Sequence, residues 1–194
     1  MKHSEKTIEE WFELGGKYHE NEEYDKAVDA FRHVVKINKN TNGWFNLGLA
    51  LRFQGNLTEA FKAFSTAQKL DPGNGEIYLQ QGLILIGQEK NEQALKKFVK
   101  AFESGLEPGN QAVAFVGMGI SFVNLDKTDD AIRNFDAVLR LDSRNLPALT
   151  MKAGAILTQG NPMAAKDIID EALRIDPEDA EALTILRLIE SALR

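Results

Sequence analysis

Apolar residues recur along the chain in short stripes of helical spacing, separated by polar turns. One stripe contains Trp44, Leu47 and Leu51, which lie three and four residues apart, as on one face of an α-helix. A second stripe follows with Ala60 and Phe64 at the same kind of spacing. The pattern therefore predicts two helices joined by a short turn.

This pair of stripes occurs five times in register. Each copy contains an alanine, and successive alanines lie 33, 34, 37 and 34 residues apart: Ala27, Ala60, Ala94, Ala131 and Ala165. A bulky anchor stands sixteen residues before each alanine: Trp11, Trp44, Tyr78, Phe115 and Leu149. A hairpin of about 34 residues cannot bury its own apolar face, so neighbouring hairpins must stack. We therefore predict one all-α domain with hairpins at about residues 8–40, 41–74, 75–111, 112–145 and 146–179.

Small residues mark the turns and the helix contacts. Gly55-Asn56 and Gly160-Asn161 each offer a glycine that tolerates a positive φ and then a side chain that caps the next helix. A further small residue follows each anchor by four positions: Gly15, Gly48, Gly82, Gly119 and Ala153. We expect the two helices of a hairpin to approach most closely at these positions.

Two departures from the repeat are visible. The spacing of 37 between the third and fourth copies implies about three extra residues, and we expect them in a surface loop at residues 104–111, which contain two glycines and a proline. After the fifth copy, residues 180–194 have the pattern of a first helix without a second. We predict that this helix caps the apolar end of the fifth hairpin, through Leu183, Leu186 and Ile189.

The repeated unit resembles the tetratricopeptide repeat, whose pattern is Trp, two residues, Leu-Gly, two residues, Tyr, and later Ala, three residues, Phe. The first copy matches with Trp11, Leu14, Gly15, Tyr18, Ala27 and Phe31. The resemblance covers nearly the whole chain, although Gln81 and Lys152 stand where the pattern has Leu. It implies a right-handed superhelical solenoid of helix pairs. It also implies that the inner face, lined by the first helix of each pair, holds a peptide or partner segment, and it does not imply an enzyme.

Composition and charge narrow the function classes. The chain has 194 residues, 43% hydrophobic and 27% charged, which suits one soluble domain. The net charge of −6 disfavours electrostatic binding to nucleic acid or to an anionic membrane. No apolar run reaches the 18 or more residues of a membrane span, and the acidic N-terminal residues do not resemble a targeting signal. We therefore expect a cytoplasmic protein, and the absence of cysteine agrees with that location.

Residues able to perform catalysis or bind metal are sparse. The nearest approach to a metal site is His19 with Glu20, Glu22 and Glu23, which lacks a second histidine at helical spacing. The sequence contains no phosphate-binding glycine loop, no nucleophile elbow and no cysteine. We predict no metal, no cofactor and no catalytic activity.

The predicted first helices carry a second apolar stripe beside their anchors. Such a helix is either fully buried or presents one apolar side to a partner. Both alternatives stay open for Leu79 and Val116, which packing between successive first helices would also explain. Asn46 and Gln80 are candidates for hydrogen bonds to an extended peptide, and Arg52 for a contact at the rim. The candidate binding residues are Phe12, Phe45, Asn46, Leu49, Arg52, Phe53, Leu79, Gln80, Leu83, Ile86, Val116, Ile120 and Val123.

One binding mode known in the family is excluded. Some tetratricopeptide domains bind an acidic C-terminal tail through Lys, Arg and Asn on the inner face, and Asn46 stands in the place of one such Asn. The corresponding positions for the cations hold Phe12, Glu13, Gly16, Glu76 and Gln80, so that clamp is absent.

Two functions are consistent with the sequence. The first is a non-catalytic adaptor whose inner groove binds an apolar or amphipathic segment of a partner protein or peptide. The second is a self-assembly module in which another copy fills the groove or covers a solenoid end. Neither function involves nucleic acid or direct membrane insertion.

Overall fold

The computed structural model describes residues 6–194, which form eleven α-helices and no strand. The helices are α1 (Ile8–Glu20), α2 (Tyr24–Ile37), α3 (Thr41–Phe53), α4 (Leu57–Leu70), α5 (Gly75–Gly87), α6 (Asn91–Glu103), α7 (Pro108–Val123), α8 (Thr128–Leu141), α9 (Leu146–Thr158), α10 (Pro162–Ile175) and α11 (Ala180–Ala192). Their number and order confirm the all-helical prediction of five hairpins followed by one further helix.

The chain divides into two compact units. The N-terminal unit comprises the residues up to Gln88 together with residues 100–106, and the C-terminal unit comprises residues 89–99 and 107–194. The division passes through α6, which contributes residues to both.

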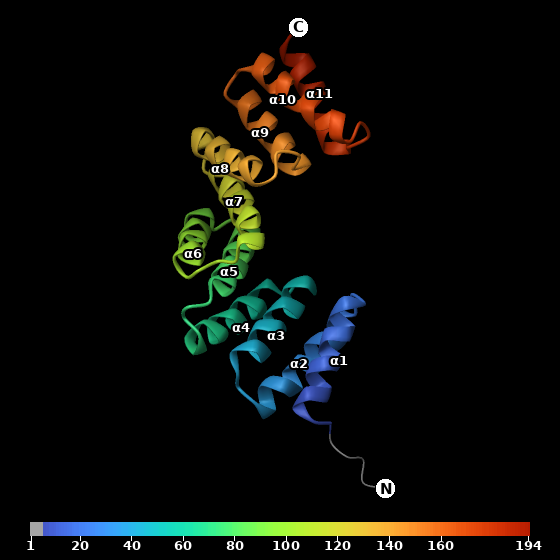
Figure 1. The fold of residues 1–194 in the computed structure, drawn as a ribbon, viewed down its shortest axis with the longest axis vertical. Coiled ribbons are helices and arrows are strands. Elements are labelled where there is room, and N and C mark those ends of the chain that lie inside the picture. The colour runs from blue at the N-terminus through green and yellow to red at the C-terminus, as the bar shows by residue number, and fades with distance from the viewer. Residues whose placement is uncertain (1–5) are drawn as a thin grey trace. The chain divides into compact units, whose positions relative to one another are not determined.

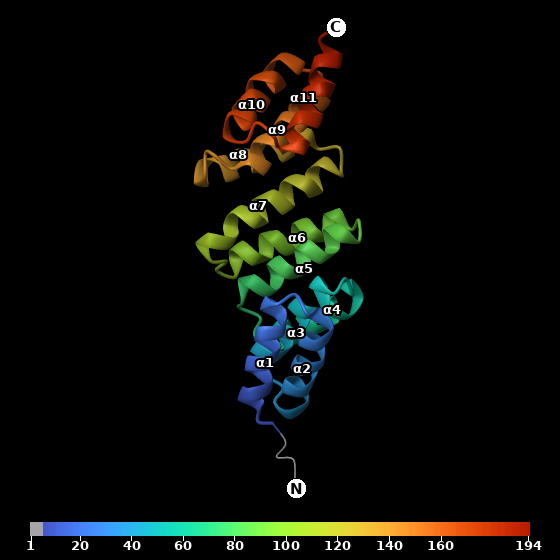
Figure 2. The same cartoon turned by 90° about the vertical axis from the view of Figure 1, so that its right-hand side faces the viewer.

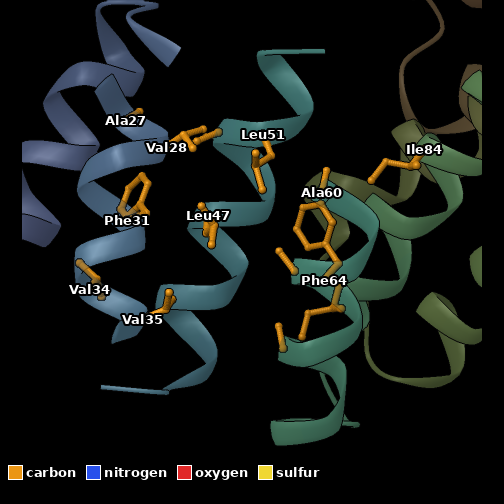
Figure 3. Close-up of a cluster of buried hydrophobic side chains, with 14 residues drawn as sticks. Ala27, Val28, Phe31, Val34, Val35, Leu47, Leu51, Ala60, Phe64 and Ile84 are labelled. Atoms are coloured by element: carbon orange, nitrogen blue, oxygen red, sulfur yellow. The ribbon is translucent and has the colours of Figure 1, made fainter. Parts of the chain in front are cut away.

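The core of the N-terminal unit lies between paired helices. In both views α1 lies beside α2, and α3 beside α4 (Figure 1, Figure 2). Figure 3 shows Phe31 on α2, Leu47 and Leu51 on α3, and Phe64 on α4 within this core. All four side chains are buried, because each belongs to the apolar stripe of its helix.

At three of the predicted glycines, Gly15, Gly48 and Gly119, the two helices of the hairpin are in close contact. A Cβ atom placed on Gly48 would lie 2.8 Å from the ring of Phe64, far inside normal contact distance. Gly15 has the same relation to Phe31, and Gly119 has it to Phe135. The phenylalanine four residues after the repeat alanine thus fills the space that the glycine leaves open.

The predicted turns are also confirmed. Gly55 and Gly160 adopt φ values of +90° and +78°, and Asn56 and Asn161 then cap α4 and α10 by accepting hydrogen bonds from backbone N–H groups. In the first of these turns the N–H of Asn56 donates to the carbonyl oxygen of Leu51 at 2.8 Å, which satisfies an otherwise free helix-end acceptor.

The expected surface loop at residues 104–111 was wrong in extent. Helix α7 begins at Pro108, so residues 108–111 form its first turn and only residues 104–107 lie outside helices. Proline suits this first position because its φ is already helical and its missing N–H would have no partner there. The extra residues therefore lengthen α7 to 16 residues.

In the C-terminal unit, α11 packs against α9 and α10, as both ribbon views show (Figure 1, Figure 2). Ala182 and Ile189 of α11 are fully buried with Leu149 of α9 and Ile169 of α10. Leu186 is partly buried against the same cluster. This confirms that a helix, Ala180–Ala192, covers the fifth hairpin. Of the residues predicted to form the cap, Leu183 is half-buried and lies outside this cluster.

Candidate functional site

An apolar cavity of about 350 Å³ opens on the face formed by the first helices of the C-terminal unit. This inner face combines α7, α9 and α11, which repeat the same register. Ile120, Gly154 and Leu188 stand 34 residues apart, and so do Val123 and Leu157. The cavity is lined by Ile120, Val123, Phe135, Met151, Gly154, Ala155, Leu157, Thr158, Ile185 and Leu188.

The lining carries no charged side chain, and Thr158 is its only polar residue. Val123 and Leu188 are 44% and 53% exposed, so apolar surface reaches solvent at the mouth. Gly154 leaves space in the middle of the face, because it has no side chain at the position where the neighbouring repeats have Ile120 and Leu188. A Cβ atom on Gly154 would lie 3.5 Å from Cδ1 of Ile185, an ordinary contact, and would meet no other group within 4 Å outside its own helix backbone and chain neighbours. Such a cavity suits a large apolar side chain.

Some lining residues were predicted and others were missed. Ile120 and Val123 were predicted, whereas Val116 is half-buried outside the cavity lining. Ile185 and Leu188 were missed because α11 was treated only as a cap. The signal was present, since Ile185 stands 34 residues after Met151 in the same register as the first helices.

On the inner face of the N-terminal unit, formed by α1, α3 and α5, several predicted residues pack inward. The rings of Phe12 and Phe31 meet edge to face at 5.7 Å between centroids, and those of Phe45 and Phe64 do so at 5.5 Å. Leu49 is also half-buried against the same core. These side chains offer a partner only part of their surface.

Helix α5 shows the same division. Leu79 is 1% exposed and is a packing residue, so of the two alternatives for this position the structure shows burial. Leu83 and Ile86 are partly exposed and remain on the face.

The two predicted amides are already engaged. The Nδ2 of Asn46 donates to the carbonyl oxygen of Asn42 at 2.9 Å. Gln80 is 8% exposed, and its Nε2 donates to Glu76 at 2.9 Å. Each of these bonds uses one of the two N–H donors of its amide, and the Oε1 of Gln80 has no hydrogen-bond partner, so contact with an extended peptide stays a prediction.

Aromatic and cationic groups gather around the C-terminal end of α3. Phe53 is 47% exposed, lies edge-on to His19 at 5.1 Å and stacks on Tyr24 at 5.5 Å. The guanidinium carbon of Arg52 lies 4.4 Å from the centre of the Phe53 ring. Burial and then the charge of Arg52 lower the pKa of His19, and Glu20 opposes the shift. The imidazole is therefore held in its neutral form at neutral pH.

Three models of the tetratricopeptide repeat match residues 11–41, 41–74 and 125–189, together more than half of the chain. The chain is a tetratricopeptide repeat protein.

Known proteins similar to this tetratricopeptide repeat protein share its repeats or its fold. A TPR repeat-containing protein of Methanocaldococcus jannaschii is 30% identical over 191 residues, which is 97% of this chain and 33% of that protein. The chain spans a third or less of the length of the curated relatives that it matches.

Two solved structures show the same fold at lower identity. PilW, described as a type IV pilus biogenesis factor, has a TM-score of 0.87 at 19% identity over 98% of this chain and 87% of its own. YrrB, described as a TPR protein with an unusual peptide-binding site, has a TM-score of 0.75 at 19% identity over 93% and 92% of the two chains. Proteins of this family are in general interaction scaffolds.

Within residues 6–194 the tetratricopeptide repeat protein has no cluster of three or more His, Cys, Asp or Glu side chains that would hold a metal ion. His19 and the glutamates of the first hairpin turn do not form one. The described helices also include none that is long and apolar enough to cross a membrane.

Proposed function

We propose that this tetratricopeptide repeat protein is a non-catalytic, cytoplasmic scaffold whose inner faces bind an apolar or amphipathic segment of a partner protein. The observation that carries the proposal is the uncharged cavity between α7, α9 and α11. A solvent-open apolar cavity of this size loses water favourably when a partner side chain enters. Burying one Leu or Phe side chain stabilises a complex by about 1.5–3 kcal/mol before ordering costs are subtracted.

The inner face of the N-terminal unit supports the same function with less exposed apolar surface. Phe53 is the most accessible of its predicted residues, and Leu83 and Ile86 add partly exposed aliphatic area. A partner segment that contacts several of these side chains gains affinity from more than one anchor, because a few buried side chains carry most of the binding energy at an interface.

The cavity allows a test that leaves the fold intact. Gly154→Leu fills the hollow from inside, and its Cβ meets only an ordinary contact. Replacing a mid-helix glycine also adds helix propensity, so this variant should be at least as stable as the wild type. Ile120→Glu places a charge in the cavity lining, and Met163→Glu on α10, at a side chain 64% exposed, is the matched control.

Wild type and the three variants would be used for affinity capture from extract of the source organism, followed by mass spectrometry. We expect a partner that the wild type and Met163→Glu retain and that Gly154→Leu and Ile120→Glu lose, with melting curves showing that all four are folded. Equal capture by all four proteins would refute binding in the cavity.

Self-assembly is the second candidate function. Leu188 on α11 is 53% exposed and Leu193, which follows the helix, is 42% exposed, so a second copy has apolar surface to cover here. Light scattering after size exclusion separates the two functions. A mass that rises with concentration and falls to that of a monomer in Leu188→Glu would favour self-assembly.

A further inference from the structure

We propose that Arg52 on the inner face of the N-terminal unit binds a carboxylate, supplied by an Asp or Glu side chain within the partner segment. This inference rests on the proposed function, because the carboxylate belongs to the segment that the inner face holds. The partner segment would then contain an acidic side chain as well as the apolar side chains that the inner face binds.

Arg52 is a half-buried cation that forms no ion pair among residues 6–194. Its Nε is buried and has no hydrogen-bond partner. Its guanidinium carbon lies 4.4 Å from the centre of the Phe53 ring. By contrast Lys152, whose side chain is 18% exposed, pairs with Asp136 at 2.7 Å.

An unmatched, partly desolvated charge is unfavourable, and an arriving carboxylate relieves that cost. Burial lowers the pKa of Arg52, and the charge of Glu76 opposes that shift. Glu76 already accepts a hydrogen bond from Gln80. A guanidinium also matches a carboxylate in geometry, because its N–H groups form a planar fork that donates two parallel hydrogen bonds.

The guanidinium must outweigh nearby acidic side chains, because Glu76 acts on Arg52 and a pocket beside Phe53 is lined by Glu22, Glu23 and Asp25. His19 contacts Phe53, and its Nδ1 is buried without a hydrogen-bond partner. Its lowered pKa keeps the imidazole neutral, so it neither competes for the anion nor adds charge. Phe53 presents exposed ring surface beside Arg52, where an apolar residue adjacent to the acidic one would pack.

The position of Arg52 favours an internal side chain over a chain end. Helix α3 lies between α1 and α5 on this face: Phe53 touches His19 of α1, and Arg52 interacts electrostatically with Glu76 of α5. A bound segment therefore has inner-face surface on both sides of Arg52. A residue in the middle of the segment meets that geometry, and a terminal carboxylate would leave half of the face empty.

The test uses acetate as the probe and the Arg Nε–H resonances in ¹H–¹⁵N NMR spectra of the intact protein as the readout. Acetate is titrated against chloride at constant ionic strength. Arg32, which is exposed and already pairs with Asp29 at 3.5 Å, is the internal reference. We expect a saturable shift at Arg52 with a midpoint about tenfold below that of Arg32, because a half-buried charge is screened less by water and salt.

Two variants and two peptides sharpen the result. Arg52→Gln should abolish the acetate response of neighbouring amides, and Glu76→Gln should strengthen the response of Arg52 by removing a nearby negative charge. Acetyl-Leu-Glu-Leu-amide should shift the Arg52 signal at lower concentration than acetyl-Leu-Gln-Leu with a free carboxyl end.

An acetate response at Arg52 no stronger than at Arg32 would overturn the proposal, and so would a preference for the peptide with the free end. Because the probes need no natural partner, failure here leaves the apolar cavity and its capture experiment untouched. Conversely, loss of capture only in the cavity variants says nothing against Arg52.

Discussion

At the residue scale, replacing Gly15 or Gly16 of α1 with alanine should change the stability of the fold in opposite directions. A Cβ atom on Gly15 would lie 2.8 Å from the Phe31 ring, whereas a Cβ on Gly16 has nothing within 4 Å. We expect Gly15→Ala to destabilise the fold by about 1–3 kcal/mol through overpacking. Gly16→Ala should stabilise it by about 0.5–1 kcal/mol through helix propensity.

Urea denaturation followed by circular dichroism measures both variants against the wild type. Each is the control for the other, since the mutation and the helix are the same. Equal effects of the two substitutions would show that the ring of Phe31 moves aside without cost, and the close-approach argument for the repeat glycines would fail.

The sequence predicts such positions well because the repeat supplies five copies of each. Gly15 and Phe31 are identifiable from register alone. Gln81 is not: it stands where the family pattern has Leu, and the structure buries it completely with Oε1 unpaired. Arg52 is similar, since its position was predicted but its unmatched charge depends on side-chain neighbours that only the fold brings together.

At the element scale, the hairpin turns place a residue at positive φ whether or not it is glycine. Glu22, Glu89 and Asp126 have φ values of 60°, 60° and 57°, where Gly55 and Gly160 serve in the equivalent turns. A left-handed conformation costs a residue with a Cβ about 1–2 kcal/mol. We therefore expect Glu89→Gly to stabilise the protein by about 1 kcal/mol in a thermal melt, and Gly55→Ala to destabilise it by a similar amount.

A melting temperature of Glu89→Gly below that of the wild type would contradict this explanation of the turn. It would mean that the entropy of the added glycine in the unfolded chain outweighs the relief of strain in the folded turn. In that case the melting temperature of Gly55→Ala is decisive, because a decrease would show that the positive φ of this turn requires a residue without Cβ.

A recurring hydrogen bond between successive hairpins was not predicted. One partner lies in the first turn of the second helix of a hairpin. The other directly follows the first helix of the next hairpin. Among the described residues the pairs are Asp25 with Gln54, Asn91 with Asn124, and Asp129 with Gln159. The partners lie about 30 residues apart and differ in type between copies, so no single-residue pattern reveals them. Helix boundaries were predictable where proline or glycine marks them, except at α7, where Pro108 begins a helix instead of a loop.

At the scale of the whole molecule, the prediction of a single domain implies that all five hairpins unfold together. The two compact units share one continuous helix, because α6 contributes residues 91–99 to one unit and residues 100–103 to the other. In a repeat protein stability is a sum of intrinsic terms and nearest-neighbour interfaces. Unfolding one unit removes part of the hydrogen-bonded helix α6, which penalises the other unit as well.

We therefore expect one cooperative unfolding transition, which native-state hydrogen exchange can test with Gly15→Ala as a local perturbation. In a cooperative molecule this change lowers the protection of the Phe31 amide in α2 and of the Ile169 amide in α10 by the same free energy. Loss of protection at Phe31 with Ile169 unchanged would show that the units unfold separately. The reciprocal variant Gly119→Ala, whose Cβ would clash with the ring of Phe135, perturbs the C-terminal unit. It must give the mirrored result for either conclusion to stand.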